Sequence, residues 1–141
     1  MDCRNYWAYS LQKRWPKRSG LKSPPTEQRS GCATTQLPER RLLDAAHIVA
    51  GADELLGQPI VANGPPLSKV HNAAFDANLI GIDAGYCIHV SEQLLALNGG
   101  PVLKQGIKAM RGRTLLIPNR MIDRPDSDRL TARLEFYTAA N

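Results

Sequence analysis

The sequence predicts an α+β fold, and three stretches of the chain carry this prediction. Residues 41–49 form an apolar run whose length is typical of a buried strand. Residues 69–78 have apolar side chains on or beside one helical face. Residues 79–83 and 86–90 are two short, largely apolar segments separated by two small residues, a pattern that indicates a β-hairpin. This mixture of strands and helices predicts a single α+β domain over residues 31–141.

The size and composition of the chain limit its class. Its 141 residues suffice for one domain with a modest core, and 43% hydrophobic with 22% charged residues is ordinary for a soluble globular protein. No apolar run approaches the roughly 20 residues that span a bilayer, and the amino terminus has no apolar signal-peptide core. We therefore expect no membrane partner and a cytoplasmic location. The three cysteines are widely spaced, which argues against a disulfide framework or a structural zinc knuckle.

The formal net charge of +5 is concentrated in residues 1–30, which contain seven Lys or Arg and two acidic side chains. Residues 31–141 balance to zero. Residues 1–30 also contain several prolines and show no sustained periodicity, so we expect a basic, flexible leader there. Basic leaders suit nucleic acid, and they are also common as solvated tails. Composition alone leaves both interpretations open.

The first half of the domain is predicted from one strand and one turn. The strand over residues 41–49 carries His47 near its end. A glycine-containing loop leads to Asn63-Gly64, which is the strongest turn signal in the chain. Pro65-Pro66 follows and removes two backbone donors, so we expect the second strand of this hairpin to be deformed.

Helix caps predict most of the remaining elements. A serine or aspartate side chain before a helical segment accepts a hydrogen bond from a free backbone N–H of the first turn. We expect helices after three such caps: Ser68 for residues 69–78, Ser91 for residues 92–96, and Asp126 or Ser127 for a helix to about residue 139. We also expect a short strand over residues 113–117, stopped by Pro118.

Two histidines and an asparagine offer groups suited to phosphodiester hydrolysis. His47 is a candidate general base, because a large fraction of an imidazole is neutral near pH 7. Asn63 supplies an amide in the connecting loop, and His71 lies in the first turn of the predicted helix. Taken alone, each residue has a simpler interpretation, as a core histidine, a turn residue and a surface helix residue respectively.

The segments DAAHI, NG, LSKVHNAAFDANLIGID and IHVS follow one another at spacings that resemble the HNH endonuclease family. The resemblance covers roughly residues 31–137 and is most specific over LSKVHNAAFDANLIGID. It implies a ββα-metal core and a metal-dependent endonuclease that hydrolyses DNA, in the manner of restriction-type nucleases. It also implies that His47 is the general base, that Asn63 braces the loop and that His71 is a metal ligand.

Carboxylates near these residues are the other candidate metal ligands. Asp44 is the carboxylate nearest to His47 in sequence and lies on the opposite face of the predicted strand. Asp76 follows His71 by five residues, which places it off the axis of that histidine on a helix. The ion would be Mg²⁺ or Mn²⁺ with waters completing its shell, or Zn²⁺.

Basic residues of the domain are candidate contacts to DNA phosphates. Lys69, Arg111 and Arg113 are the ones we expect, although nearby acidic residues equally indicate a solvated face. His89 alternates with apolar neighbours on the predicted hairpin, and we expect it to face solvent without a role.

Two departures from the family pattern support a second hypothesis. Many HNH proteins have Asp or His directly before the base, where this chain has Ala46, and Pro65-Pro66 replaces apolar strand residues. These features favour a catalytically degenerate DNA-binding protein with the same fold. A third hypothesis is a truncated fragment of a larger nuclease, because the resemblance stops before Gly31. The recognised DNA site and the oligomeric state stay open.

Overall fold

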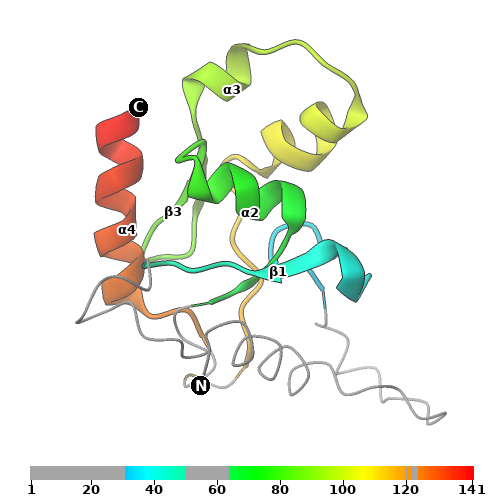
Figure 1. Cartoon of the computed structure of the whole chain (residues 1–141). Helices are drawn as coiled ribbons and strands as arrows, with labels where there is room; N and C mark the ends of the chain where they lie inside the picture. Colours follow the sequence, from blue (N-terminus) through cyan, green and yellow to red (C-terminus); the bar gives the residue numbers. More distant parts are fainter. Residues whose placement is uncertain (1–30, 50–63, 120, 122–123) are drawn as a thin grey trace, which may run out of the picture.

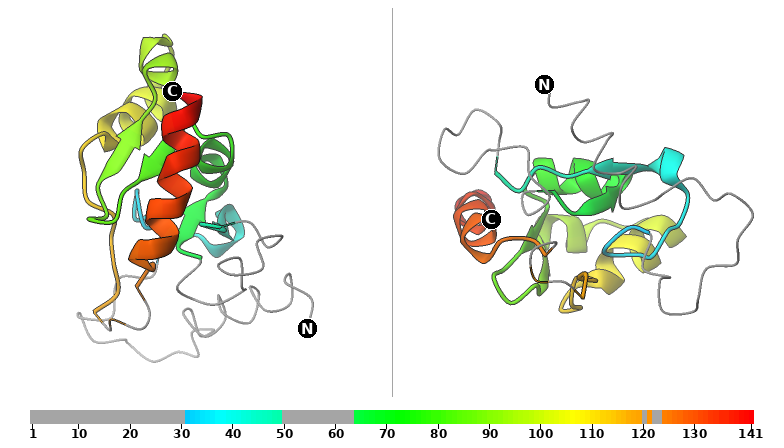
Figure 2. Two further views of the ribbon diagram at one scale, coloured as in Figure 1. Left: turned by 90° about the vertical axis from the view of Figure 1, so that its left-hand side faces the viewer. Right: turned by 90° about the horizontal axis from the view of Figure 1, so that it is seen from below.

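The computed structural model describes residues 31–49, 64–119, 121 and 124–141, so the predicted leader and Asn63 lie outside the described residues (Figure 1). The described chain combines two two-stranded antiparallel sheets with short helices. This mixture agrees with the predicted α+β class. Figure 2 shows the last helix, α4 (Ser127–Ala140), standing beside the strands. Among the described helices, none has both the length and the apolar character needed to cross a membrane.

The first sheet and the helix after it form one continuous unit. β1 (Leu43–Ala45) pairs antiparallel with β2 (Pro66–Ser68), and α2 (Lys69–Asp76) begins at the next residue. The strand that we predicted over residues 41–49 is therefore much shorter than expected. Its beginning is occupied by a 3₁₀ turn, η2 (Arg40–Leu42), and the chain leaves the sheet after Ala45.

Pro65 and Pro66 do not prevent β2 from forming, contrary to the deformation that we expected. Neither proline has an N–H to donate, but both carbonyls accept hydrogen bonds. Pro65 O accepts from Ala46 N at 3.0 Å, and Pro66 O accepts from Ala33 N at 2.8 Å. Pro66 stands at the first position of the strand, where a proline is best tolerated. The prolines therefore limit the length of β2 and leave its pairing intact.

All three predicted helix caps are formed. The capping hydrogen bonds run from His71 N to Ser68 Oγ, from Leu94 N to Ser91 Oγ, and from Arg129 N to the Asp126 carboxylate. α2, α3 (Glu92–Ala96) and α4 therefore begin where the sequence predicts. Asp126, rather than Ser127, is the cap of α4.

The second sheet is the predicted hairpin. β3 (Ile80–Ile82) pairs antiparallel with β4 (Ile88–Val90), with Gly81 opposite His89. Asp83 N donates to Cys87 O at 3.1 Å, which extends the pairing by one step toward the turn. This register decides which side chains share a face of the hairpin.

Between α3 and α4, the described residues up to 119 return along β4 without forming a strand. Residues 113–117, which we predicted as a strand, make a single β-bridge between Thr114 and Cys87, so that prediction is wrong. Before them lie a π-helical segment, η4 (Val102–Ile107), and a 3₁₀ turn, η5 (Lys108–Met110). These elements were not predicted, because their spacing departs from the 3.6-residue period of an α-helix.

Apolar side chains from both sheets, α2 and α4 meet in one core. Its largest fully buried members are Phe75, Ile48, Leu67, Ile80, Ile82, Leu115 and Leu130. α4 packs against β3, and Gly81 permits this close approach, since a Cβ at this position would lie 2.8 Å from Tyr137 Cγ. The core thus holds the hairpin, α2 and α4 together and positions the polar groups at their edges.

Candidate functional site

His47 lies just after β1 and is partly buried. Burial lowers the pKa of the His47 imidazole, and the charge of the Asp76 carboxylate opposes part of that shift. The net downward shift favours the neutral form of the ring near pH 7. His47 and Asp76, two of the predicted site residues, therefore interact electrostatically in the folded chain.

Asp76, the last residue of α2, has a cation near it as well as an imidazole. Burial lowers the pKa of the Arg133 guanidinium, and the Asp76 carboxylate opposes part of that shift. Arg133 reaches from α4 and donates from Nη2 to Phe75 O at 2.6 Å, with its guanidinium 4.8 Å from the centre of the Phe75 ring. We call His47, Asp76 and Arg133 the His47 group. It combines a proton acceptor, an exposed carboxylate and an anchored cation.

His71, the predicted metal ligand, is buried and uses both ring nitrogens within the protein. Nε2 lies 2.6 Å from Gly106 O and Nδ1 lies 2.6 Å from Ser68 Oγ. A carbonyl only accepts, so Nε2 carries the proton, and Nδ1 accepts from the Ser68 hydroxyl in the neutral ring. Burial lowers the pKa of His71 and so favours this neutral form, while the hydrogen bond to Gly106 opposes part of the shift. In this arrangement neither nitrogen has a lone pair left for a metal.

The other predicted site residues lie on several elements. Asp44 is half-buried within β1, and Lys69 is exposed at the first position of α2. Arg111 and Arg113 are exposed after η5, where Arg111 Nη2 lies 3.1 Å from Glu92 Oε1. These charged residues lie on separate elements of the fold. Arg111 forms its ion pair with Glu92 of the same chain.

A second group of versatile side chains lies on the hairpin formed by β3 and β4. Asp83, Cys87 and His89 each offer one ligand atom, and these atoms lie within 4.8 Å of one another. Carboxylate oxygen, thiol sulfur and imidazole nitrogen are donors that together can hold a divalent metal ion. We call these three residues the hairpin triad.

Backbone geometry places the hairpin triad on one face. Cys87 and His89 are two residues apart in an extended segment, so their side chains point to the same side. Asp83 lies across from Cys87, and its Oδ1 accepts hydrogen bonds from Gly85 N at 2.9 Å and Cys87 N at 3.0 Å. These bonds hold the carboxylate in the turn and leave Oδ2 directed toward His89.

Asp83 and His89 interact directly, so the expectation that His89 only faces solvent is corrected. His89 Nε2 lies 2.9 Å from Asp83 Oδ2, and the His89 side chain is 43% exposed. The hydrogen bond from His89 lowers the pKa of Asp83; burial opposes this, and the backbone donors of Cys87 and Gly85 add to it. Asp83 is therefore more acidic than an ordinary aspartate.

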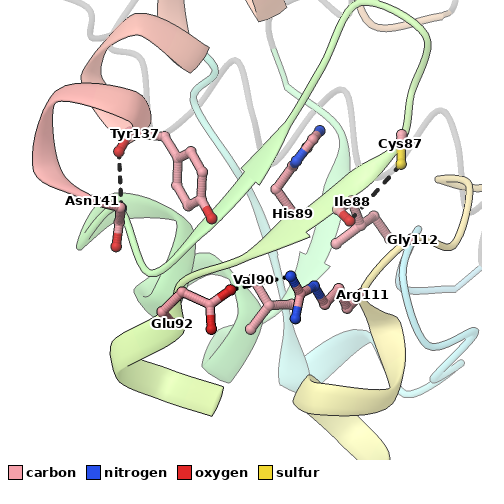
Figure 3. A pocket seen from close by; sticks show the side chains of 9 residues that line it. All are labelled: Cys87, Ile88, His89, Val90, Glu92, Arg111, Gly112, Tyr137 and Asn141. Carbon is pink, nitrogen blue, oxygen red and sulfur yellow. Dashed lines mark hydrogen bonds and ion pairs between the residues drawn. The ribbon is translucent and has the colours of Figure 1, made fainter. Parts of the chain in front are cut away.

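A shallow pocket of about 270 Å³ adjoins the hairpin triad (Figure 3). Cys87 and His89 line it, together with Tyr137 of α4 and the Arg111–Glu92 pair. The Tyr137 and His89 ring centres are 6.2 Å apart. Burial raises the pKa of Tyr137, Arg111 lowers it and Glu92 raises it, which is consistent with a side chain placed between those two charges. Two members of the triad, Cys87 and His89, thus form part of the wall of this pocket.

A local sequence signal for the hairpin triad existed and was missed. Asp83, Cys87 and His89 occur within seven residues around Ala84-Gly85, so a hairpin in that register brings all three to one face. Our interpretation treated His89 by alternation alone and gave Cys87 and Asp83 no part.

In comparisons with known proteins, the sequence matches no family model and no curated protein.

Proposed function

We propose that the chain is a metal-dependent DNA endonuclease that hydrolyses phosphodiester bonds. The observation that carries this proposal is the neutral, partly buried His47 with Asp76 near it. These residues belong to a unit in which two antiparallel strands lead directly into a helix, β1–β2–α2. This element order is the one that a ββα-metal core requires, and it supports the resemblance to the HNH family.

His47 would act as the general base. A base with a pKa below the working pH is unprotonated and ready to take a proton from an attacking water. Burial favours that condition for His47 by lowering its pKa, and the charge of Asp76 opposes part of this shift. Asn63, which the resemblance makes a loop brace, would orient this base.

Asp76 is the carboxylate best placed to hold a divalent ion beside His47. It is exposed at the end of α2, and oxygen donors suit Mg²⁺ or Mn²⁺. A bound ion would supply charge stabilisation at the scissile phosphate. His71 can join as a ligand only by giving up its bond to Gly106 or to Ser68, and Asp44 of β1 is the alternative carboxylate.

DNA as the substrate is supported by charge. Residues 1–30 carry the whole net charge of +5, and Arg133 provides a guanidinium within the His47 group. A guanidinium anchored on one side by a carbonyl keeps further N–H donors for a phosphate. Lys69, Arg111 and Arg113 would add contacts to the backbone of the DNA, with Arg111 first releasing Glu92.

A second candidate function is DNA binding without cleavage. It is favoured by His71, whose two ring nitrogens are both engaged by the protein. In that case binding would need no metal ion.

The test is nicking of supercoiled plasmid by the purified chain with Mg²⁺, with Mn²⁺ or with EDTA. We expect metal-dependent nicking that His47→Ala reduces by about 10²–10⁴-fold, the usual contribution of general base catalysis. Added imidazole should restore part of the rate in His47→Ala, which a purely structural role would not allow. Asp76→Asn should also lose nicking, whereas Asp128→Asn, which changes an exposed carboxylate of α4, should not.

Retention of nicking in His47→Ala and Asp76→Asn would refute these assignments. A folded chain that binds DNA equally well in EDTA and never nicks it would establish the second candidate instead.

A further inference from the structure

We propose that the hairpin triad is a zinc site, in which Asp83, Cys87 and His89 bind one Zn²⁺ ion. This site lies on β4 and the turn before it, whereas the His47 group is built from the ends of β1 and α2 and from α4. It is therefore a second metal site, and it stands whether or not the chain cuts DNA.

The donor set fits zinc better than it fits Mg²⁺ or Ca²⁺. Zn²⁺ is borderline-soft and accepts thiolate, imidazole and carboxylate together, whereas Mg²⁺ and Ca²⁺ take oxygen donors almost exclusively. The charges also balance, because an aspartate and a thiolate compensate a divalent ion while the imidazole stays neutral. Binding would release the thiol proton of Cys87.

The distances between the donor atoms of the triad lie on either side of, and close to, those between the ligands of a tetrahedral zinc site. With Zn–N and Zn–O bonds of about 2.0 Å and a Zn–S bond of about 2.3 Å, tetrahedral ligand atoms lie roughly 3.3–3.5 Å apart. His89 Nε2 and Asp83 Oδ2 are 2.9 Å apart, and all three donor atoms lie within 4.8 Å of one another. Shifts of a few tenths of an ångström between Asp83 and His89, with a rotation of the Cys87 side chain, would complete the geometry.

The protein prepares the site in advance. Two backbone N–H groups hold Oδ1 of Asp83, so the other oxygen is already aimed at His89. Such outer hydrogen bonds orient ligands and strengthen metal binding. In the absence of metal, His89 donates from Nε2 to Asp83. On binding, Nε2 would give up this proton to solvent and coordinate the ion, and Nδ1 would take a proton from solvent, so that the ring stays neutral.

The fourth position would be open to the pocket. Cys87 and His89 both line this hollow, so a water molecule can reach an ion held between them. The alternative is an Asp83–His89 ion pair that only stabilises the hairpin. Such a pair would explain two members of the triad and would give the Cys87 thiol no function. The involvement of Cys87 is therefore the decisive point.

The test is titration of the tag-free chain with Co²⁺, followed by displacement with Zn²⁺. A cysteine ligand gives Co²⁺ a thiolate-to-metal charge-transfer band in the near ultraviolet, and a site made only of oxygen and nitrogen donors does not. We expect the band to saturate at one equivalent of Co²⁺ per chain, whatever binds beside His47. The band should be lost in Cys87→Ser, and the affinity should fall at least about tenfold in His89→Asn and Asp83→Asn.

Three variants serve as controls. Cys3→Ser and Cys32→Ser remove the other two thiols and should keep the band. His47→Ala removes the proposed nuclease base and should bind Co²⁺ as the wild type does, so failure of one proposal is separable from failure of the other. Persistence of the band in Cys87→Ser, or its absence from the wild type, would overturn the zinc site.

Protection from alkylation provides a readout without substitution. Stoichiometric Zn²⁺ should slow the reaction of the Cys87 thiol with iodoacetamide in the wild-type chain, as located by peptide mass mapping. Equal alkylation of Cys87 with and without Zn²⁺ would contradict the proposal even if the variants did not fold.

Discussion

At the residue scale, the two histidines of the β1–β2–α2 unit differ in what surrounds their rings. His47 is partly buried and has the Asp76 charge near it, while His71 is held between Ser68 and Gly106. The sequence presents both as imidazoles near one another along the chain. The environment of His71 depends on Gly106, which is 35 positions away in the sequence, so the difference between the two histidines could not be predicted from the local pattern.

The burial of these histidines predicts a loss of stability in mild acid. Burial holds the pKa of His71 below its ordinary value of 6.5 in the folded chain, and His47 shifts in the same direction. As the pH falls below about 6.5, the unfolded chain therefore binds more protons than the folded chain does. The stability contributed by these neutral histidines is complete above that pH and is lost as the pH falls toward their pKa values in the folded chain. The free energy of unfolding should fall by at most about 1.4 kcal/mol per pH unit for each such histidine.

Urea unfolding of the wild type, His71→Gln and the double variant His47→Gln/His71→Gln measures this slope between about pH 7.5 and about pH 5, either side of the ordinary histidine pKa. The slope should be smaller in the single variant and smallest in the double variant. An unchanged slope in the double variant would show that other groups cause the acid sensitivity.

At the element scale, the helices were the most predictable part of the fold. Ser68, Ser91 and Asp126 each cap a helix, because a cap acts on its own first turn and needs no distant partner. The hairpin was predicted for a similar reason, since its strands and turn are adjacent in sequence. The structure of residues 102–117 was not predicted, because this segment is held by contacts with residues outside it, in β4 and at His71.

The two serine caps predict unequal costs for the same substitution. Ser68 Oγ and Ser91 Oγ each accept a backbone N–H at 3.2 Å, but Ser68 also bonds His71 Nδ1 at 2.6 Å. Ser91→Ala should lower the free energy of unfolding by about 1 kcal/mol, the usual effect of a lost cap. Ser68→Ala should cost about 2–3 kcal/mol, because it also leaves a buried ring nitrogen without a partner.

Urea denaturation of both variants at neutral pH provides the comparison, and Ser91→Ala serves as the matched control for the loss of a cap alone. Equal costs would mean that the Ser68–His71 bond contributes nothing to stability.

At the scale of the whole molecule, α4 closes the domain over α2 and the hairpin. Arg133 donates to the last turn of α2, and Tyr86 Oη donates to Pro125 O at 3.0 Å just before α4. The His47 group and the pocket beside the hairpin triad both depend on this closure, whereas the triad itself is formed within the hairpin. Arg133 of the His47 group and Tyr137 at the pocket come from α4, so their parts in these sites could not be predicted without knowing where the last helix packs.

The contact between α4 and β3 depends on the absence of a side chain at Gly81. A Cβ there would lie 2.8 Å from Cγ of Tyr137, an atom close to the helix backbone that cannot easily move away. Gly81→Ala should therefore lower the free energy of unfolding by about 1–3 kcal/mol, the usual cost of overpacking. Gly100→Ala is the matched control, because a Cβ at Gly100 meets no atom within 4 Å, and it should be neutral or slightly stabilising.

A double-mutant cycle tests whether Tyr137 is the cause. Tyr137→Ala removes the ring, so adding Gly81→Ala to it should cost far less than Gly81→Ala costs in the wild type, which gives a coupling energy of about 1–2 kcal/mol. The four proteins would be compared by urea denaturation at one pH. A full additive cost in the Tyr137→Ala background would mean that the penalty at Gly81 arises from the strand itself, and that α4 does not rest on the face of the hairpin in the way described.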